Sequence, residues 1–461
     1  MLAALLTPAV AFGQVTIPST PAGKVFDEWL SSFNAADPTR IAEFQRSYDR
    51  KTPVMEVLEQ RKETGGYKLV GMEAGSPTSL MATLQEVELP DSEIRFQMTV
   101  EPGSPSRIVT LEVNPLPVPR LDEAAALAAL AARTDALVRQ DRFSGAVLIA
   151  RNDKVLFERA WGLADRANET ANEVDTQFRL GSLNKIITAV AALQLVEAGE
   201  LSLDEPIAAY LPDYPNKEAA SKVTVRHLLT HRAGVGEIGF GESPEFNTPA
   251  EFIVRRDSMQ TPADYVRQYA GQKLRFEPGS ETEYSSLGFM VLGALIEHMS
   301  GKSYYDYVQA HVYDVAGMKD TGSLPETTPV PKRAVGYMRQ GEALVPNVDT
   351  VPYRGSPAGG GYSTVGDLLR FAQALQGGRL LSPGMVAEAT KLQSGWQGLG
   401  FEVVGEGALA TYGHGGMAPG MNAHFRVYPA LGYVIVVLSN LDPPAAGLVY
   451  SFVHERMPVG D

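Results

Sequence analysis

The chain has 461 residues, 44% of them hydrophobic, and a formal net charge of −14 from 40 Lys and Arg against 54 Asp and Glu. This is enough apolar material for a large core and for two domains, while the acidic balance and the lack of a basic cluster argue against a nucleic-acid or anionic-membrane partner. The absence of cysteine excludes disulfides, thiolate metal ligands and a cysteine nucleophile.

The chain begins with a short apolar run. Residues 1–12 are too few to span a bilayer, and Ala9-Val10-Ala11 has the small-x-small form of a signal-peptidase site. No Lys or Arg precedes Lys24, so the positive start of an ordinary leader is missing. We expect residues 1–13 to be a signal peptide or a disordered leader, and the protein to be exported (periplasmic or secreted), with a cytoplasmic location as the alternative and no transmembrane anchor.

Residues 14–113 show helical periodicity first and strand alternation afterwards. Apolar residues recur at helical spacing from Val25 to Phe33, and Asp37-Pro38 supplies an N-cap with proline at the first helical position, which predicts two short helices. Alternating runs separated by turn residues then predict an antiparallel meander of four strands, at 66–73, 79–87, 94–100 and 108–113.

Helices followed by a curved sheet predict a small α+β domain over residues 14–113, and this order resembles the cone-shaped nuclear-transport-factor-like fold. No catalytic constellation is evident within it. It could carry a homo-oligomer interface, form a lid over a cleft, or be a passive folding neighbour.

The proline-rich stretch at residues 114–120 cannot form helix and predicts a semi-rigid linker to a second domain at 121–461. That domain begins with an Ala-rich helix and a hairpin signal. Helical patterns broken by Gly and Pro loops then predict a helical subdomain from 200 to about 390. Strand-like runs return at 401–404, 408–412, 423–427 and 433–438, before a closing helix at 445–455. One sheet begun before the helical subdomain and completed after it predicts a cleft at the seam.

A candidate nucleophile lies just before the apolar segment 186–193. Ser182 and Lys185 are three residues apart, so on a helix that begins near Ser182 they share a face and the lysine amine can reach the hydroxyl. The amino end of the helix adds free backbone N–H groups, which completes the parts of an activated nucleophile. The S-x-x-K pattern by itself recurs by chance roughly once in a chain of this size, so its meaning depends on partners.

Two later segments offer those partners. Tyr284 lies on a loop that enters a helical pattern, with Ser286 two residues further on. His414, Gly415 and Gly416 end a predicted strand, where paired glycines leave the backbone open for a substrate to approach. Each segment alone is more often structural than catalytic, so the combination carries the argument.

S-x-x-K at a helix start, then Y-S-S, then H-G-G near the carboxyl end resemble, in this order, the serine β-lactamase and penicillin-binding-protein superfamily, nearest its class C and family VIII esterase branch. The resemblance covers nearly all of 121–461 and extends to the stretches 225–231, 317–322 and 356–364. It implies an α/β (α+β) fold in which an antiparallel sheet is flanked by helices and joined by a helical subdomain, preceded here by the small α+β domain.

The resemblance also implies roles for the motif residues. Ser182 attacks a carbonyl carbon, either Lys185 or Tyr284 takes its proton, and the backbone N–H groups of Ser182 and Met417 bind the oxyanion. No cofactor is implied. Four residues are expected to bind substrate: Ser286, His414, Gly415 and Gly416.

Two positions depart from the family pattern. Ser286 stands where asparagine is usual and His414 where lysine is usual, and both changes weaken recognition of a substrate amide or carboxylate. We therefore expect a serine hydrolase that cleaves small carboxylic esters through an acyl-Ser182 intermediate. D-Aminopeptidase or amidase activity ranks second and penicillin-binding or β-lactamase activity third, and a non-catalytic peptidoglycan-sensing module is the alternative from a different class.

His227 and His231 are four residues apart on a predicted helix, a spacing that can bind a metal. No glutamate lies between them and no third ligand is evident, so a packed or capping pair is expected and no metal is assigned. The glycines at 359–361 do not precede Lys-Ser/Thr, which favours a flexible loop over a phosphate-binding loop.

Overall fold

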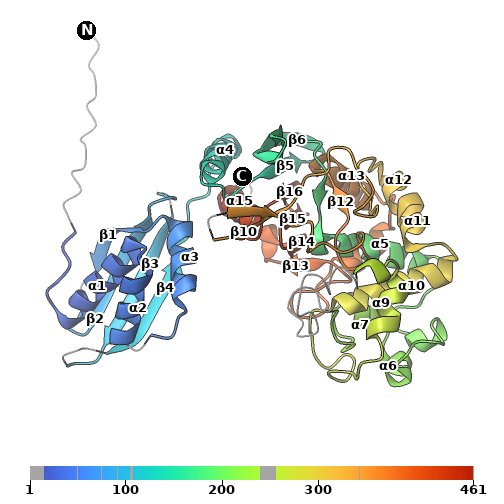
Figure 1. Ribbon diagram of the computed structural model, residues 1–461, viewed down its shortest axis with the longest axis horizontal. Coiled ribbons are helices and arrows are strands. Elements are labelled where there is room, and N and C mark those ends of the chain that lie inside the picture. The colour runs from blue at the N-terminus through green and yellow to red at the C-terminus, as the bar shows by residue number, and fades with distance from the viewer. Residues whose placement is uncertain are drawn as a thin grey trace, which may run out of the picture. The chain divides into compact units, whose positions relative to one another are not determined.

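The computed structural model describes residues 15–459 except 49, 74, 91, 104–106, 239–255 and 342. It divides into two compact units, Met1–Pro119 and Arg120–Asp461, which run from blue to cyan and from teal to red in Figure 1. The leader expected at residues 1–13 lies outside the described residues. Over the ranges that are described, we find no helix that combines the length and the apolar character needed to cross a membrane.

The first unit consists of helices followed by one antiparallel sheet in the order β1-β2-β3-β4. Thr20 and Asp37 cap the first two helices, each with proline directly after the cap. The core gathers aromatic rings, including Phe26, Phe33 and Phe96, between α1 and the sheet. The elements are α1 (Pro21–Ala35), α2 (Pro38–Ser47), α3 (Val54–Thr64), β1 (Tyr67–Glu73), β2 (Ser79–Glu86), β3 (Glu93–Val100) and β4 (Ile108–Pro115).

Two features of this unit differ from the sequence prediction. A third helix, α3, was not predicted, because it is mostly charged or polar and has no side-chain cap hydrogen bond at its start. Strand β4 also runs to Pro115, two residues into the expected linker, and the Leu116 N–H donates to the Glu93 carbonyl oxygen at 2.8 Å. Proline is tolerated there because β4 is an edge strand, where an N–H can face away from the sheet.

The second unit contains a six-stranded antiparallel sheet in the order β13-β14-β15-β16-β5-β6 (Figure 1). Pairing of β16 with β5 joins the end of the chain to the start of the unit, which confirms one sheet begun before the helical subdomain and completed after it. The strands are β5 (Gly145–Arg151), β6 (Lys154–Trp161), β13 (Glu402–Val404), β14 (Thr411–Ala418), β15 (Met421–Tyr428) and β16 (Tyr433–Ser439).

Strand alternation sorts the two faces of this sheet. On β15, Phe425 belongs to the main core and meets Phe371 of α13 (Val365–Gln376) edge to face. The neighbouring His424 stacks instead on Tyr450 of α15 (Ala445–Arg456), which packs against α4 (Glu123–Arg139). Helices therefore flank the antiparallel sheet, as the fold class predicted.

The segment predicted as a strand at 408–412 is only partly extended. Residues Gly407–Leu409 form the short 3-10 helix η4, and β14 begins at Thr411 and carries the His-Gly-Gly motif along its length. Gly405 and Gly407 have φ values of +80° and +58°, which turn the chain before the strand.

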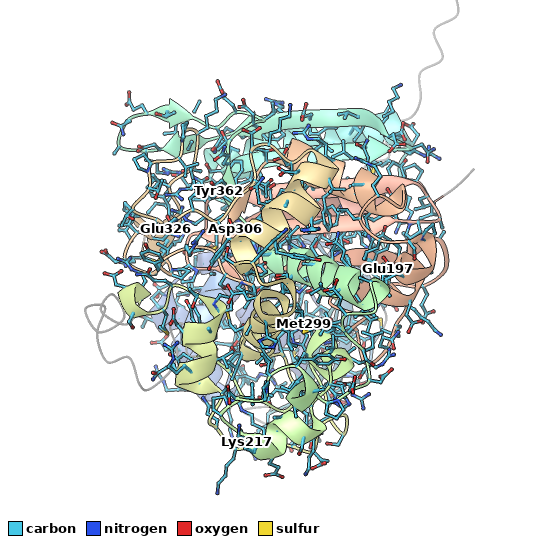
Figure 2. The ribbon with its side chains drawn as sticks, turned by 90° about the vertical axis from the view of Figure 1, so that its right-hand side faces the viewer. Glu197, Lys217, Met299, Asp306, Glu326 and Tyr362 are labelled. Carbon is cyan, nitrogen blue, oxygen red and sulfur yellow. The ribbon has the colours of Figure 1, made fainter. Side chains whose placement is uncertain are left out.

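Helices and short strands make up the remainder of the unit, and Figure 2 shows their side chains. The hairpin of β10 and β11 was not predicted. These elements are β7 (Leu163–Asp165), β8 (Thr170–Ala171), β9 (Phe178–Arg179), η1 (Gly181–Leu183), α5 (Asn184–Glu197), η2 (Ile207–Ala209), α6 (Lys217–Lys222), α7 (Val225–Leu229), α9 (Pro262–Tyr269), α10 (Ser286–Ser300), α11 (Tyr304–Val308), η3 (Gln309–Tyr313), α12 (Asp314–Ala316), β10 (Tyr337–Gln340), β11 (Ala343–Pro346), β12 (Tyr362–Ser363) and α14 (Pro383–Ala389).

The strand that leads into η1 is fixed by an ion pair. Arg179 on β9 pairs with Tyr362 on β12, and its guanidinium binds both carboxylate oxygens of Glu326, at 3.2 Å from Nε and 2.6 Å from Nη2. Glu326 and Tyr362 are labelled in Figure 2. A bidentate, mostly buried pair of this kind sets direction as well as distance, so the chain enters η1 at a defined angle.

The backbone of β14 packs directly against the backbone of η1. A Cβ built on Gly416 would lie 1.9 Å from the Leu180 carbonyl oxygen, and one on Gly181 would lie 2.9 Å from the Met417 nitrogen. Glycine at 416 therefore permits close approach of β14 to η1, which is a different reason from the opening toward a substrate that the sequence suggested. Gly415, by contrast, has room for a Cβ, since the nearest atoms would be 3.9 Å away, an ordinary van der Waals distance.

We expect Gly416→Ala to destabilise the protein and Gly415→Ala to leave it nearly unchanged. The added methyl at 416 must push β14 away from η1, and overpacking of this kind costs about 1–3 kcal/mol in the free energy of unfolding. Urea denaturation of both variants measures this difference. Equal loss in the two variants would contradict the close contact assigned to Gly416.

Candidate active site

Ser182 lies in the middle of η1, half-buried, one turn before α5. The turn is clamped on one side by glycines: the Gly360 N–H donates to the Gly181 carbonyl oxygen, and the Leu180 N–H donates to the Gly361 carbonyl oxygen, both at 3.1 Å. Gly360 and Gly361 have φ values of +79° and +68°. The glycine segment at 359–361 therefore forms a hydrogen-bonded turn against η1, where the sequence suggested a flexible loop.

Lys185 is fully buried and faces Ser182. Its Nζ lies 3.3 Å from Ser182 Oγ, donates a short hydrogen bond to the Ala358 carbonyl oxygen, and sits 4.7 Å from the centroid of the Tyr284 ring. Burial lowers the pKa of Lys185 to about 7, against the opposing attraction of Glu237 and Glu402. A large fraction of this amine is therefore neutral near pH 7 and able to accept a proton.

Polar side chains of helix α5 hydrogen-bond to the backbone of residues 356–358. Asn184 Nδ2 and Thr188 Oγ1 donate to the carbonyl oxygens of Ser356 and Pro357, both at 2.7 Å, and Lys185 donates to the next carbonyl along the chain. These three donors lie on a helix whose first ten residues are all buried. The segment at 356–358 is thus fixed to α5 at the position of the lysine amine.

Tyr284 lies just before α10, next to Ser182 and Lys185. Burial raises the pKa of its phenol and a hydrogen bond with the Ser182 hydroxyl lowers it, with burial the larger effect. The phenol is therefore protonated near neutral pH. The structure brings together Ser182, Lys185 and Tyr284, the three residues predicted to form the catalytic set.

One of the two backbone groups predicted to bind an oxyanion, the Met417 N–H, lies beside the residue that precedes Ser182. Met417 N lies against Gly181, as the close contact of β14 with η1 requires. Asn422 fixes this end of β14, since its Nδ2 donates to the Gly416 carbonyl oxygen at 3.1 Å and its Oδ1 accepts the Ala446 N–H at 2.8 Å. The Met417 side chain is 62% exposed beside the site.

The His414 side chain is buried, unlike a side chain that contacts solvent and substrate. It is 2% exposed, its Nδ1 is hydrogen-bonded to the Gly415 carbonyl oxygen, and its Nδ1 lies 3.6 Å from Glu402 Oε1. Burial lowers its pKa to about 4, although Glu402 acts in the opposite direction. His414 is therefore neutral near pH 7 and belongs to the buried part of the site. Contact of Ser286, His414, Gly415 and Gly416 with a substrate stays a prediction.

Two carboxylates near Lys185 were not found from the sequence. Glu237 accepts the Ile238 N–H at 2.8 Å and the Ser286 N–H at 2.7 Å, and burial raises its pKa. Glu402 accepts the Gly415 N–H at 3.2 Å and pairs with Arg426. Burial alone would raise the pKa of Glu402, but His414 and Arg426 hold it below its usual range. No spacing signals either residue, because only the tertiary fold brings them to the lysine.

Two aromatic rings beside Tyr284 were also missed as site residues. His231 stacks on Tyr284 with ring centroids 4.4 Å apart, and Trp396 stacks at 6.4 Å and is 39% exposed. His227 and His231 do not converge on one point: His227 Nδ1 accepts the Thr224 N–H and His231 Nδ1 accepts the Ser285 N–H.

Comparison with known proteins agrees with this geometry. Residues 127–453 match the Beta-lactamase family. Esterase EstB of Burkholderia gladioli is 34% identical over 361 residues, covering 68% of this chain and 91% of the esterase. Penicillin-binding protein 4 of Amycolatopsis lactamdurans is 29% identical over 332 residues, covering 67% and 84%. The crystal structure of a penicillin-binding protein from Bacillus halodurans superposes with a TM-score of 0.61 at 29% identity, over 68% of this chain and 97% of that one.

The family match spans more than half of the chain, and Ser182, Lys185 and Tyr284 lie within it. The chain therefore belongs to the beta-lactamase family and is a serine hydrolase of that family.

Proposed function

We propose that the protein cleaves small carboxylic esters through an acyl-Ser182 intermediate. The observation that carries the proposal is the fully buried Lys185 amine, 3.3 Å from Ser182 Oγ, with its pKa lowered to about 7. A base is most effective when its pKa lies near the working pH. A serine hydroxyl keeps its proton at neutral pH and is a weak nucleophile, and such an amine is a base that can accept this proton.

In the acylation step, Ser182 Oγ forms a bond to the ester carbonyl carbon and its proton passes to Lys185 Nζ. The resulting oxyanion accepts hydrogen bonds from the Ser182 and Met417 N–H groups, each worth about 3 kcal/mol of transition-state stabilisation. Collapse breaks the carbon–oxygen bond to the alcohol. The alkoxide takes the proton from Lys185 through the Tyr284 hydroxyl, which is protonated near neutral pH.

Deacylation repeats these steps with water in place of the serine. Lys185, neutral again, accepts a proton from the attacking water through Tyr284, and Ser182 Oγ leaves with that proton. The choice of Lys185 over Tyr284 as the base follows from opposite pKa shifts: burial lowers the pKa of the amine and raises that of the phenol.

Neutral, apolar esters suit the surface around Ser182. His414 is buried and neutral, so it offers no fixed positive charge for a substrate carboxylate. Tyr284, Trp396 and Met417 expose 37%, 39% and 62% of their surfaces, which provides apolar contacts for an acyl or alcohol group. The likeness to an esterase at 34% identity supports the same substrate class.

A second candidate is hydrolysis of amides that carry a free amino group, including amides of D-residues. Glu237 favours it, because its carboxylate lies close enough to Lys185 to raise the lysine pKa and could pair with a substrate ammonium. Turnover of D-amino acid amides that is lost in Glu237→Gln, with no turnover of simple esters, would replace the ester proposal by this one.

We expect Ser182→Ala to lower the turnover of short-chain p-nitrophenyl esters by at least about 10³-fold, since removal of a nucleophile abolishes the covalent route. Wild type should also form a covalent adduct with a fluorophosphonate probe at Ser182. The assay runs both proteins on short-chain esters, D-amino acid amides and a chromogenic cephalosporin. Unchanged ester turnover in the variant contradicts acyl-Ser182, and rapid penicillin acylation without turnover in the wild type favours a sensing module.

We expect kcat/KM for ester hydrolysis to rise with pH through about 7, because only neutral Lys185 accepts the serine proton. Glu237 raises the pKa of Lys185, so Glu237→Gln should shift this acidic limb to lower pH. Glu283→Gln is the control, since Glu283 is exposed and pairs with Arg275. A limb that stays in place or moves to higher pH in Glu237→Gln would exclude Lys185 as the titrating base.

We expect Trp396→Ala to raise KM for aryl and naphthyl esters by about 2–10-fold, the usual worth of an aromatic stacking contact. KM for the methyl ester of the same acid should change less, because no aromatic group is then present to stack. Steady-state kinetics on the two ester series provide the comparison. An equal rise in both series would show that Trp396 acts on the fold of the site rather than on substrate binding.

A further inference from the structure

His231 holds the loop that carries Tyr284 from both sides. Its carbonyl oxygen accepts the Glu283 N–H at 2.9 Å, and its Nδ1 accepts the Ser285 N–H at 3.0 Å. The two residues that flank Tyr284 are therefore tied to one residue, which restricts the position of the tyrosine backbone.

The imidazole of His231 also lies behind the phenol. The two rings are stacked, with centroids 4.4 Å apart and planes inclined by 29°, and His231 is in turn backed by Phe289 at 5.2 Å. His231 is 2% exposed whereas Tyr284 is 37% exposed. A buried ring thus supports a half-exposed one on the side away from solvent, and this limits the angles that Tyr284 can adopt.

The hydrogen bond from Ser285 determines which nitrogen of His231 carries the proton. Because Nδ1 accepts, the imidazole proton lies on Nε2. Burial, and after it the nearby Lys185 and His414, hold the pKa of His231 well below its usual range. The ring therefore remains neutral and keeps Nδ1 free to accept, so the loop contact persists across the working pH range.

The backbone of His231 is suited to this double contact. Its φ is +56°, in the left-handed region that His and Asn enter more readily than most other residues. The turn after α7 places the carbonyl oxygen and the side chain of His231 against the same loop, so both acceptors face Glu283–Ser285.

We propose that His231 is a positioning residue that sets the orientation of the Tyr284 hydroxyl toward Ser182 and Lys185 during acyl transfer. The inference rests on the proposed function, because it requires Tyr284 to pass a proton. His231 acts only through Tyr284, and its expected signature is a loss in kcat with little change in KM.

Two substitutions separate the hydrogen bond from the ring. His231→Asn keeps an acceptor near the Nδ1 position and a residue type that tolerates φ of +56°, whereas His231→Phe keeps a ring and removes the acceptor. We expect kcat of His231→Asn to stay within about 5-fold of wild type. We expect His231→Phe to lose about 10–100-fold in kcat with KM within about 3-fold, as small misplacements of a catalytic group do.

A double-mutant cycle with Tyr284→Phe identifies the route of the effect. Once the hydroxyl is gone, His231→Phe should lower kcat by less than about 2-fold further. The matched control is His227→Phe, on α7 just before the turn that holds His231, half-buried, with its Nδ1 accepting the Thr224 N–H. Its kcat should match wild type. Thermal midpoints are recorded for every variant, and His231→Gln, which moves the acceptor away from the Nδ1 position, replaces His231→Phe if the latter does not fold.

Wild-type kcat in His231→Phe, or the same fold-loss with and without the Tyr284 hydroxyl, would overturn the positioning role. A wild-type protein that turns over no ester or amide and forms no adduct at Ser182 would instead overturn the proposed function. The two failures are therefore distinguishable in one set of measurements.

Discussion

The site depends first on the burial of Lys185. Helix α5 is enclosed along this stretch, so the lysine cannot extend its amine into water. Its nearest partners are a neutral carbonyl oxygen, the Ser182 hydroxyl and the faces of Tyr284 and Phe289 rather than a directly paired carboxylate. Removing an ammonium from water costs several kcal/mol when it is not paired. The attraction of Glu237 and Glu402 offsets part of that cost, and the balance leaves the pKa of the amine at about 7.

The second constraint is that backbone contacts position Ser182. Three segments far apart in the sequence meet at η1: the approach through Leu180, the turn at Gly360 and Gly361, and β14 at Gly416. Peptide groups cannot change rotamer, so the geometry at Ser182 follows from the sheet and the turn together. This explains why Ser182 lies at the seam between the sheet and the helical subdomain, and why that seam can hold Met417 N beside Gly181.

The sequence predicted the elements whose pattern is local. Alternation and turn residues located the meander of the first unit and most strands of the six-stranded sheet. The order of the motifs predicted that Ser182, Lys185 and Tyr284 lie close together. Helix α3 was missed because it lacks a side-chain cap and a long apolar face, and η4 was taken for strand because glycines with positive φ turn the chain there. Glu237, Glu402, His231 and Trp396 carry no spacing signal. Their proximity to Lys185 or Tyr284 arises from loops and strand ends that only the folded chain brings together.

The charges of the residues that the sequence did not reveal affect which substrates the site can bind more than the motif residues do. Of the positive groups described near Ser182, Arg426 is paired with Glu402, a large fraction of Lys185 is neutral at pH 7, and the buried histidines at 231 and 414 are neutral. Because Glu402 and Arg426 neutralise each other, the carboxylate charge that remains is the partial charge of Glu237, whose pKa is raised. A substrate carboxylate would find no fixed cation at His414, which disfavours ligands that a lysine at this position would hold. A neutral ester needs no such cation, and a substrate ammonium would be attracted to Glu237. This electrostatic environment supports the proposal of ester or amino-amide substrates over β-lactams, which carry a carboxylate.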